Sequence, residues 1–264
     1  MNTYAANLST IFIEVPFIER FKKAKEAGFQ FIECQFPYEV PADTIRAELE
    51  KHRLSLVLIN LPAGDWDNGE RGLAIFPERK EEFKKSVAKG IEYALALGVS
   101  KLHCLAGVIP PHADKELSRK TYIDNLTYAA VQMEPHQLTL LIEPINQLDM
   151  PGYFLNNIND AARIIDEINL QNLKLQFDFY HIQRSQGNLL STYAQFFDKV
   201  EHIQIADVPG RHQPNTGEIH YQHVLAEIIQ SGYKGYIGLE YIPLGKSEES
   251  FTWIHDFAEG GLSK

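Results

Sequence analysis

Four oxygen-bearing side chains stand at or beside the ends of four consecutive short apolar segments in the second half of the chain. They are Glu143, Asp178, Gln204 and Glu240. A carboxylate is costly to bury without a partner, so carboxylates at matching places in successive segments need a shared one. Oxygen ligands suit a hard divalent cation such as Mg²⁺ or Mn²⁺. The pattern predicts one divalent metal site formed by these four residues.

Other roles remain open for these positions. A carboxylate at the end of a strand can cap the following helix or form an ion pair instead. Gln204 is the weakest ligand because its amide is neutral, and Asp207, three residues later, competes with it.

Two further residues are candidates for holding a substrate. His181 follows Asp178 by three residues and could hold a substrate oxygen or stabilise negative charge that develops on it. Arg211 lies in the polar sequence Pro-Gly-Arg-His-Gln-Pro and could clamp a substrate carboxylate with a bidentate bond. The alternatives are a structural hydrogen bond for His181 and a solvated position for Arg211. Arg71 and Trp66, in a long polar stretch, are candidates for covering the site.

Eight short apolar segments, each followed by an amphipathic stretch, must position these residues. The segments are nearly continuously apolar, which is typical of parallel strands covered on both faces. We expect strands at Thr3–Leu8, Phe29–Cys34, Leu54–Asn60, Lys101–Leu105, Thr139–Glu143, Leu173–Asp178, His202–Ile205 and Tyr236–Glu240. Alternation of strands and helices predicts a parallel sheet. Eight repeats favour an α/β fold of the closed (β/α)8, or TIM-barrel, type over an open sheet.

The stretches between the strands carry helix signals. Phe83, Val87, Ile91 and Leu95 recur at every fourth position, which predicts the buried face of a helix. Pro41 suits the first turn of its helix. Three glycines directly follow such stretches, where a helix end favours a left-handed residue. These are Gly28, Gly98 and Gly232.

The connections that follow the strands are longer and more polar than those that follow the helices. Examples are Leu61–Pro77, Ala106–Ala113, Pro144–Asn156 and Asp207–His220. In a barrel these loops gather at the carboxyl ends of the strands, where active sites are built. No Gly-x-Gly-x-x-Gly turn follows the first strand, which disfavours an open dinucleotide-binding fold.

Length and composition limit the class of protein. The chain has 264 residues, a barrel needs about 250, and we expect residues 1–264 to form one barrel domain. The net charge of −10 disfavours nucleic acid and anionic membranes as partners. Cys34 and Cys104 lie far apart in apolar segments, which indicates buried thiols in a reducing compartment. With no signal-peptide pattern and no run of about 18 apolar residues, we expect a cytoplasmic protein.

Five segments spread over the whole chain resemble the hydroxypyruvate isomerase and 2-oxo-tetronate isomerase family, within the xylose-isomerase-like barrels. They are Ala-Ala-Asn-Leu-Ser (5–9), Glu-Val-Pro-Phe-Ile-Glu-Arg-Phe (14–21), Ile-Asp-Asn-Leu-Thr-Tyr-Ala-Ala (123–130), Gly-Glu-Ile-His-Tyr (217–221) and Gly-Leu-Glu-Tyr (238–241). The resemblance implies that Glu143 and Glu240 are the paired proton donor and acceptor. It also implies that Glu143, Asp178, Gln204 and Glu240 bind the metal.

The related ketose 3-epimerases suggest the substrate contacts. His181 and Arg211 resemble residues that hold the sugar in those enzymes. The epimerases usually have His where this chain has Gln204, and this departure favours an oxygen-only metal site and the hydroxypyruvate branch of the family.

The resemblance implies a reaction that moves a carbonyl one carbon along a small hydroxy-keto acid. The substrate pair would be hydroxypyruvate and tartronate semialdehyde, or 2-oxo-tetronate and 3-oxo-tetronate. One glutamate would remove a proton and the other would return it to the adjacent carbon, while a metal ion stabilises the enediolate. The expected partner is this small molecule, and a homo-oligomer is possible because most such enzymes are symmetric oligomers.

Three alternatives to this reaction stay open. A ketose 3-epimerase on the same scaffold would invert a carbon instead of shifting a carbonyl. A metal-dependent endonuclease would need several metal ions and a basic surface, which the charge of −10 disfavours. A catalytically silent barrel would act as a binding module.

Overall fold

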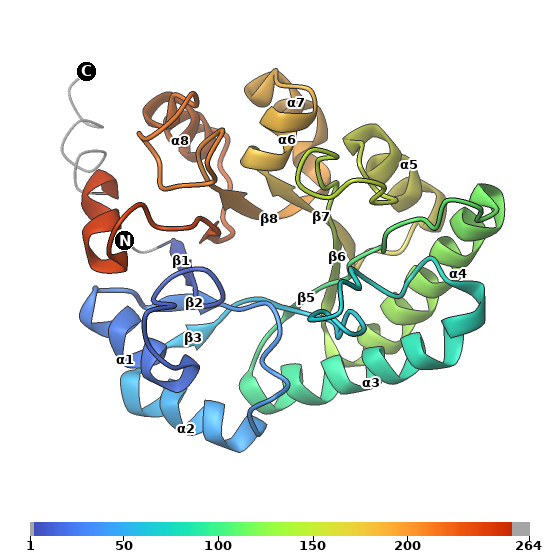
Figure 1. Cartoon of the computed structure of the whole chain (residues 1–264), viewed down its shortest axis with the longest axis horizontal. Helices are drawn as coiled ribbons and strands as arrows, with labels where there is room; N and C mark the ends of the chain where they lie inside the picture. The colour runs from blue at the N-terminus through green and yellow to red at the C-terminus, as the bar shows by residue number, and fades with distance from the viewer. Residues whose placement is uncertain (1–2, 255–264) are drawn as a thin grey trace.

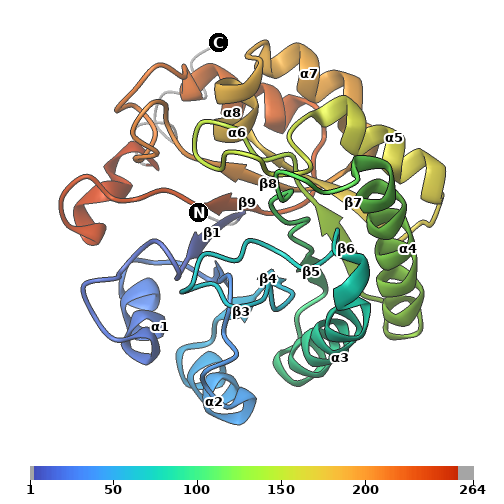
Figure 2. The same cartoon turned by 45° about the vertical axis from the view of Figure 1, so that its right-hand side comes forward.

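Nine short strands form one parallel sheet at the centre of the computed structural model, which describes residues 3–254 (Figure 1). In chain order the strands are β1 (Tyr4–Asn7), β2 (Phe31–Glu33), β3 (Ser55–Leu56), β4 (Ile59–Asn60), β5 (Lys101–His103), β6 (Thr139–Ile142), β7 (Leu173–Asp178), β8 (Val200–Ile205) and β9 (Ile237–Leu239). Their order in the sheet is β3-β2-β1-β9-β8-β7-β6-β5-β4. The first and last strands of the chain are therefore neighbours, and Figure 2 shows β1 beside β9.

The two ends of the sheet are consecutive in the chain. β3 pairs with β2, whereas β4 pairs with β5. Only Val57 and Leu58 lie between β3 and β4. The backbone carbonyl of Leu58 still accepts a hydrogen bond from the backbone N–H of Cys34, the residue that follows β2. The sequence predicted a single strand over Leu54–Asn60, and the structure divides it into two short ladders with different neighbours. The barrel is nearly closed through this segment, which confirms the predicted TIM-barrel fold.

Helices surround the barrel (Figures 1 and 2). They are α1 (Phe17–Glu26), α2 (Ala42–His52), α3 (Lys80–Leu97), α4 (Lys115–Met133), α5 (Ile158–Ile168), α6 (Phe179–Ser185), α7 (Leu189–Phe196) and α8 (Tyr221–Gln230). The described part of the chain also contains short 3-10 helices: η1 (Pro77–Arg79), η2 (Glu134–His136), η3 (Phe197–Lys199) and η4 (Ser247–Phe251). Among residues 3–254, no helix has the length and apolar character needed to cross a membrane.

The expected glycines after the helices are confirmed, whereas Pro41 lies one residue before the expected first turn and the expected buried face of α3 is wrong at one end. The three glycines that follow helical stretches have positive φ angles of 91°, 69° and 81°. Pro41 precedes α2 as its N-cap residue. On α3, Phe83 and Val87 are buried, but Leu95 is 51% exposed. A spacing of four advances about 40° past a full turn at each step, so the line drifts off the buried face. The residues of α3 that stay buried are instead spaced alternately three and four positions apart, and Gly90 and Ala94 belong to this buried line.

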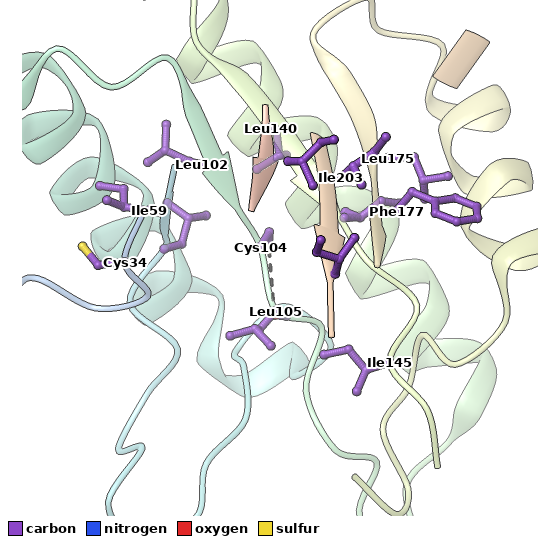
Figure 3. Close-up of a cluster of buried hydrophobic side chains, with 14 of the residues drawn as sticks. Cys34, Ile59, Leu102, Cys104, Leu105, Leu140, Ile145, Leu175, Phe177 and Ile203 are labelled. Atoms are coloured by element: carbon purple, nitrogen blue, oxygen red, sulfur yellow. Dashed lines mark hydrogen bonds between the residues drawn. The ribbon is translucent and has the colours of Figure 1, made fainter. Parts of the chain in front are cut away.

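Apolar side chains from the strands and helices form one main core (Figure 3). The strands contribute Leu102, Leu140, Leu175, Phe177 and Ile203. Cys34 and Cys104 lie in the same core, and both are free thiols, as the sequence predicted. Burial raises the pKa of Cys104 to about 12 and raises that of Cys34 as well. Because the thiolate is the reactive form, these cysteines serve packing and not chemistry.

Candidate active site

A small cavity of about 160 Å³ lies where the carboxyl ends of the strands meet. Positions in the strands or within two residues after them supply polar lining residues from both halves of the chain: Gln35, Asn60, His103, Glu143, Gln176 and Glu240. The long loops and α6 add Trp66, Asp149, His181 and Arg211. A larger hollow of about 590 Å³ lies between α2 and the end of α3, but its charged side chains are exposed to solvent. The buried polar groups therefore mark the smaller cavity as the candidate site.

Three of the predicted metal ligands are buried carboxylates that influence one another across this site. Glu143, Asp178 and Glu240 are 4%, 2% and 6% exposed. Burial raises the pKa of Glu143 well above its usual range, and the negative charges of Asp178 and Glu240 raise it further. Burial raises the pKa of Asp178 to about 7, against the opposing effect of Arg211. Burial also raises the pKa of Glu240 despite the same guanidinium. A concentration of buried negative charge is suited to a cation.

Several buried atoms at the site lack a hydrogen-bond partner in the part of the chain that the structure describes. They include Oε1 of Glu143, Oδ2 of Asp178, Oε1 of Gln176 and Nε2 of His103. Buried polar atoms are nearly always satisfied, so orphaned oxygens that face one site indicate a missing partner. Ligand atoms of Glu143, Asp178 and His181 lie within 4.8 Å of one another. This buried group can hold a metal ion, and its oxygen-rich chemistry suits a hard divalent cation.

Asp178 also caps the helix that follows it, a role that the sequence left open as an alternative to metal binding. Its Oδ1 accepts a hydrogen bond of 2.7 Å from the backbone N–H of Tyr180 and so caps α6. Its Oδ2 stays free of hydrogen bonds and faces the site. One oxygen of Asp178 therefore has a structural role, and the other remains available as a ligand.

Gln204 lies in β8 beside the carboxylates, but its amide is held by neighbouring side chains. Nε2 donates to Oε1 of Glu33 at 2.7 Å, and Oε1 accepts from Nε2 of Gln176 at 2.7 Å. Its competitor Asp207 accepts hydrogen bonds from backbone N–H groups of its own loop, at Val208, Thr216, Gly217 and Ile219. The carboxylate of Asp207 thus organises the loop after β8, and neither Asp207 nor Gln204 is among the residues that line the cavity.

His181 and Arg211 both reach the site. His181 is buried in α6, and its Nε2 lies 3.7 Å from Oδ2 of Asp178. Arg211 is 25% exposed, so the solvated alternative is wrong for its side chain. Its Nη2 lies 2.5 Å from Oε2 of Glu240 and 3.7 Å from Oδ2 of Asp178. Its guanidinium carbon also lies 5.1 Å from the centre of the Tyr180 ring.

The two residues proposed to cover the site are stacked on each other. Trp66 lines the cavity, and the guanidinium carbon of Arg71 lies 4.1 Å from the centre of its ring. Nη1 of Arg71 donates to the backbone carbonyls of Trp66 and Glu70. Trp66 thus forms part of the cavity wall, while Arg71 braces it.

The first half of the chain supplies a polar network that the sequence analysis missed. Asn7 donates to Oε1 of Glu33 at 3.0 Å and to Oε1 of Glu240 at 3.1 Å. Gln35 donates to the same oxygen of Glu240 at 2.9 Å, and His202 pairs with Oε2 of Glu33 at 2.7 Å. Asn7 and Glu33 are the last residues of β1 and β2. Each ends a strand as the structure has it, but each lies one residue before the end of the strand expected from the sequence, Thr3–Leu8 or Phe29–Cys34.

Comparison with known proteins shows the family of this chain. A family model described as xylose isomerase-like TIM barrel matches residues 21–257. The hydroxypyruvate isomerase of Escherichia coli (strain K12) is 43% identical over 257 residues, covering 97% of this chain and 100% of that protein. The chain belongs to the hydroxypyruvate isomerase family. The 2-oxo-tetronate isomerase of Cupriavidus necator is 41% identical, covering 97% of this chain and 99% of that protein. The chain is therefore an isomerase of this family.

A solved structure shows the same barrel over almost the full length. It comes from Brucella melitensis, is described as an AP endonuclease of family 2 and is 42% identical to this chain. The two structures match with a TM-score of 0.94 over 96% of this chain and 98% of that one. The family resemblance stated from the sequence is confirmed, and so is the fold.

Proposed function

We propose that this member of the hydroxypyruvate isomerase family interconverts a small 2-oxo-3-hydroxy acid and its 3-oxo-2-hydroxy isomer. The observation that carries the proposal is a pair of buried glutamates, Glu143 and Glu240, that line one small cavity together with orphaned oxygens suited to a cation. The relatives described as hydroxypyruvate isomerase and 2-oxo-tetronate isomerase support the same reaction class.

The two glutamates are proposed to carry the proton. Among residues 3–254, one oxygen of Glu143 has no hydrogen-bond partner, and burial raises the pKa of this carboxyl, which favours the protonated form and suits it to deliver a proton. Glu240 is held by Asn7, Gln35 and Arg211, which fix its carboxylate against the cavity. One glutamate removes the hydrogen from the carbon beside the carbonyl, and the other delivers a proton to the neighbouring carbon.

The residues that would hold the metal are Glu143, Asp178, Gln204 and Glu240. A divalent cation, Mg²⁺ or Mn²⁺, would supply Lewis-acid stabilisation of the negative charge on the two substrate oxygens. The side chains around the cavity contribute by holding the two substrate oxygens in one place and by excluding water from the buried site.

The volume of the cavity suits a short acid. Its volume of about 160 Å³ is well below the roughly 300–1,000 Å³ typical of drug-sized ligands. Arg211 is proposed to bind the substrate carboxylate and His181 a substrate oxygen. Hydroxypyruvate and 2-oxo-tetronate differ by one hydroxymethylene group, a difference worth only about 1–3 kcal/mol through apolar contact.

The decisive experiment assays both acids with purified protein. We expect isomerisation of at least one acid in the presence of Mg²⁺ or Mn²⁺, loss of turnover after exhaustive chelation, and recovery when the metal is returned. The absence of turnover with either acid and either metal would overturn the proposal. A parallel assay with free ketoses would detect a 3-epimerase.

The description of the Brucella protein raises nuclease activity as a second candidate. A net charge of −10 repels the phosphate backbone, and the polar groups of the site lie inside a cavity of about 160 Å³. We therefore propose a small-molecule substrate and no nucleic-acid partner. The two free buried thiols suit a reducing compartment, so we also propose a cytoplasmic location.

A further inference from the structure

Asn146, in the loop after β6, has an amide whose orientation is fixed by the backbone. It is fully buried. Its Oδ1 accepts hydrogen bonds from the backbone N–H groups of Leu148 at 3.0 Å and Asp149 at 2.9 Å. Backbone N–H groups only donate, so the amide oxygen must occupy this side and the amide nitrogen the other. Nδ2 then donates to Oδ2 of Asp149 at 3.1 Å.

The second hydrogen of this amide nitrogen points at His181. Nδ2 of Asn146 and Nδ1 of His181 lie 2.7 Å apart. An amide nitrogen has no lone pair to offer, so Nδ1 must accept. A doubly protonated ring would place a hydrogen on Nδ1 against this amide hydrogen, so the ring that accepts here is neutral. A neutral imidazole that accepts at Nδ1 carries its proton on Nε2.

We propose that Asn146 is a positioning residue that fixes His181 as the Nε2–H tautomer, and that His181 therefore donates a hydrogen bond to a substrate oxygen and does not bind the metal ion. The substrate half of this statement rests on the proposed isomerase function. The tautomer half rests only on the hydrogen bonds around Asn146.

His181 could be a metal ligand or a hydrogen-bond donor to the substrate, and its position alone does not decide between these two roles. The Nε2 of His181 lies close enough to Glu143 and Asp178 to join a metal-binding group. A histidine that binds a metal almost always donates its other ring N–H to a carboxylate, a carbonyl or water. Here the other ring nitrogen faces a donor instead. Nε2 of His181 lies 3.7 Å from Oδ2 of Asp178, too far for a hydrogen bond, so its hydrogen remains available to a substrate oxygen.

The tautomer can be read directly in the metal-free protein. In ¹⁵N–¹H correlation spectra of histidine-labelled enzyme, with the signal assigned by its loss in His181→Gln, we expect a proton on Nε2. In Asn146→Asp the new carboxylate can only accept, so the proton should move to Nδ1. Because this substitution places a carboxylate against Asp149, the double variant Asn146→Asp/Asp149→Asn repeats the measurement without that repulsion.

Activity and metal affinity provide the second readout. Asn146→Asp should lower kcat by about 10²–10³-fold, the usual effect of losing one oxyanion donor. Asn156→Asp adds the same charge to the same loop, where the side chain bonds only backbone carbonyls of Tyr153 and Phe154, and should leave kcat nearly unchanged. His181→Gln should weaken Mn²⁺ binding, measured by calorimetry, by less than about 10-fold, below the cost of losing even an outer-shell partner.

Each outcome is decisive. A proton on Nδ1 in the wild type, or a large loss of Mn²⁺ affinity in His181→Gln, would overturn the assignment. If the spectra show Nε2–H but neither acid is isomerised, the proposed function fails and the tautomer assignment stands.

Discussion

Glu143 and Glu240 carry the same functional group in different hydrogen-bond environments. Oε1 of Glu143 is buried without a partner, so this carboxyl can exchange a proton without breaking a hydrogen bond. Both oxygens of Glu240 accept hydrogen bonds, from Asn7 and Gln35 on one side and from Arg211 on the other. Environments that differ in this way are how proteins give two like groups complementary acid and base roles.

The first prediction concerns these two glutamates. Glu143→Gln and Glu240→Gln each keep a side-chain oxygen but remove the base, so each should lower kcat by at least about 10²-fold. The double variant should lose much less than the product of the single effects, because the two act as a unit. Exchange of the substrate hydrogen with deuterated solvent separates the roles: a variant lacking only the returning acid still exchanges it. Near-normal turnover in either metal-loaded single variant would contradict the two-glutamate mechanism.

The second prediction concerns the pH dependence of stability in the metal-free protein. The pKa of Asp178 is raised from 3.8 to about 7 by burial, although Arg211 opposes the rise. Between about pH 4 and pH 7 the unfolded chain loses this proton while the folded chain keeps it. The contribution of Asp178 to stability is therefore fully present below about pH 4 and is lost as the pH rises through 7.

Urea unfolding of metal-free protein between pH 5 and pH 8 tests this sign. Asp178→Asn should gain stability relative to the wild type as the pH rises, because the variant has no buried charge to form. Asp67→Asn, at an exposed loop position, should show no such trend. A constant difference between wild type and Asp178→Asn across this range would contradict the prediction.

Strand ends explain both what the sequence predicted at this site and what it missed. Glu143, Asp178 and Glu240 were found because a charged residue ends an otherwise apolar segment. Asn7 and Glu33 sit before the last residue of their expected segments, Thr3–Leu8 and Phe29–Cys34, where a single polar residue resembles normal variation. Their role depends on contacts with residues more than 150 positions away, which no local pattern encodes.

Two elements differ from the prediction for local physical reasons. The third strand keeps its expected position, but its ladder divides because the two halves pair with different neighbours. In the loop after β8, Arg211 adopts a φ of 57°, rare for a residue with a side chain. That conformation sets the approach of its guanidinium to Glu240, and the sequence contains no signal for it.

The third prediction tests the packing of β9 against this polar network. A Cβ atom at Gly238 would lie 2.4 Å from Oε2 of Glu33. Gly238→Ala should therefore displace Glu33, which orients both Asn7 and Gln204, and cost about 1–3 kcal/mol of stability through overpacking. We expect Mn²⁺ affinity to fall as well.

A second glycine provides the control. Gly232 has a φ of 81° and no atom within 4 Å of an added Cβ. Gly232→Ala should cost about 1–2 kcal/mol through left-handed strain alone and leave Mn²⁺ affinity unchanged. Equal effects of the two substitutions on metal binding would show that Glu33 does not influence the site.

At the scale of the whole molecule, the site joins the two ends of the chain. β1 and β9 are neighbours in the sheet, and the Asn7 side chain at the end of β1 bonds Glu240 just after β9. The proposed metal ligands Glu143, Asp178, Gln204 and Glu240 follow or lie in β6, β7, β8 and β9. A ligand held by all four would therefore connect half of the barrel positions and stabilise the folded chain as a unit.

The fourth prediction is that a divalent metal raises the melting temperature of the whole barrel. A ligand that binds only the folded state at about 100 times its Kd adds about 2.7 kcal/mol of stability. For a chain of this size each kcal/mol raises the melting temperature by about 2–4 °C, so saturating Mn²⁺ should raise it by about 5–10 °C, measured by calorimetry at fixed pH. Chelation should reverse the shift, and Glu143→Gln/Asp178→Asn should abolish it because two buried carboxylates become neutral amides, which are poor ligands for a hard cation. The same shift in that double variant would place the stabilising ion elsewhere on the molecule. No shift with either Mg²⁺ or Mn²⁺ would exclude a tightly bound ion from the folded protein, and with it the metal-assisted form of the reaction.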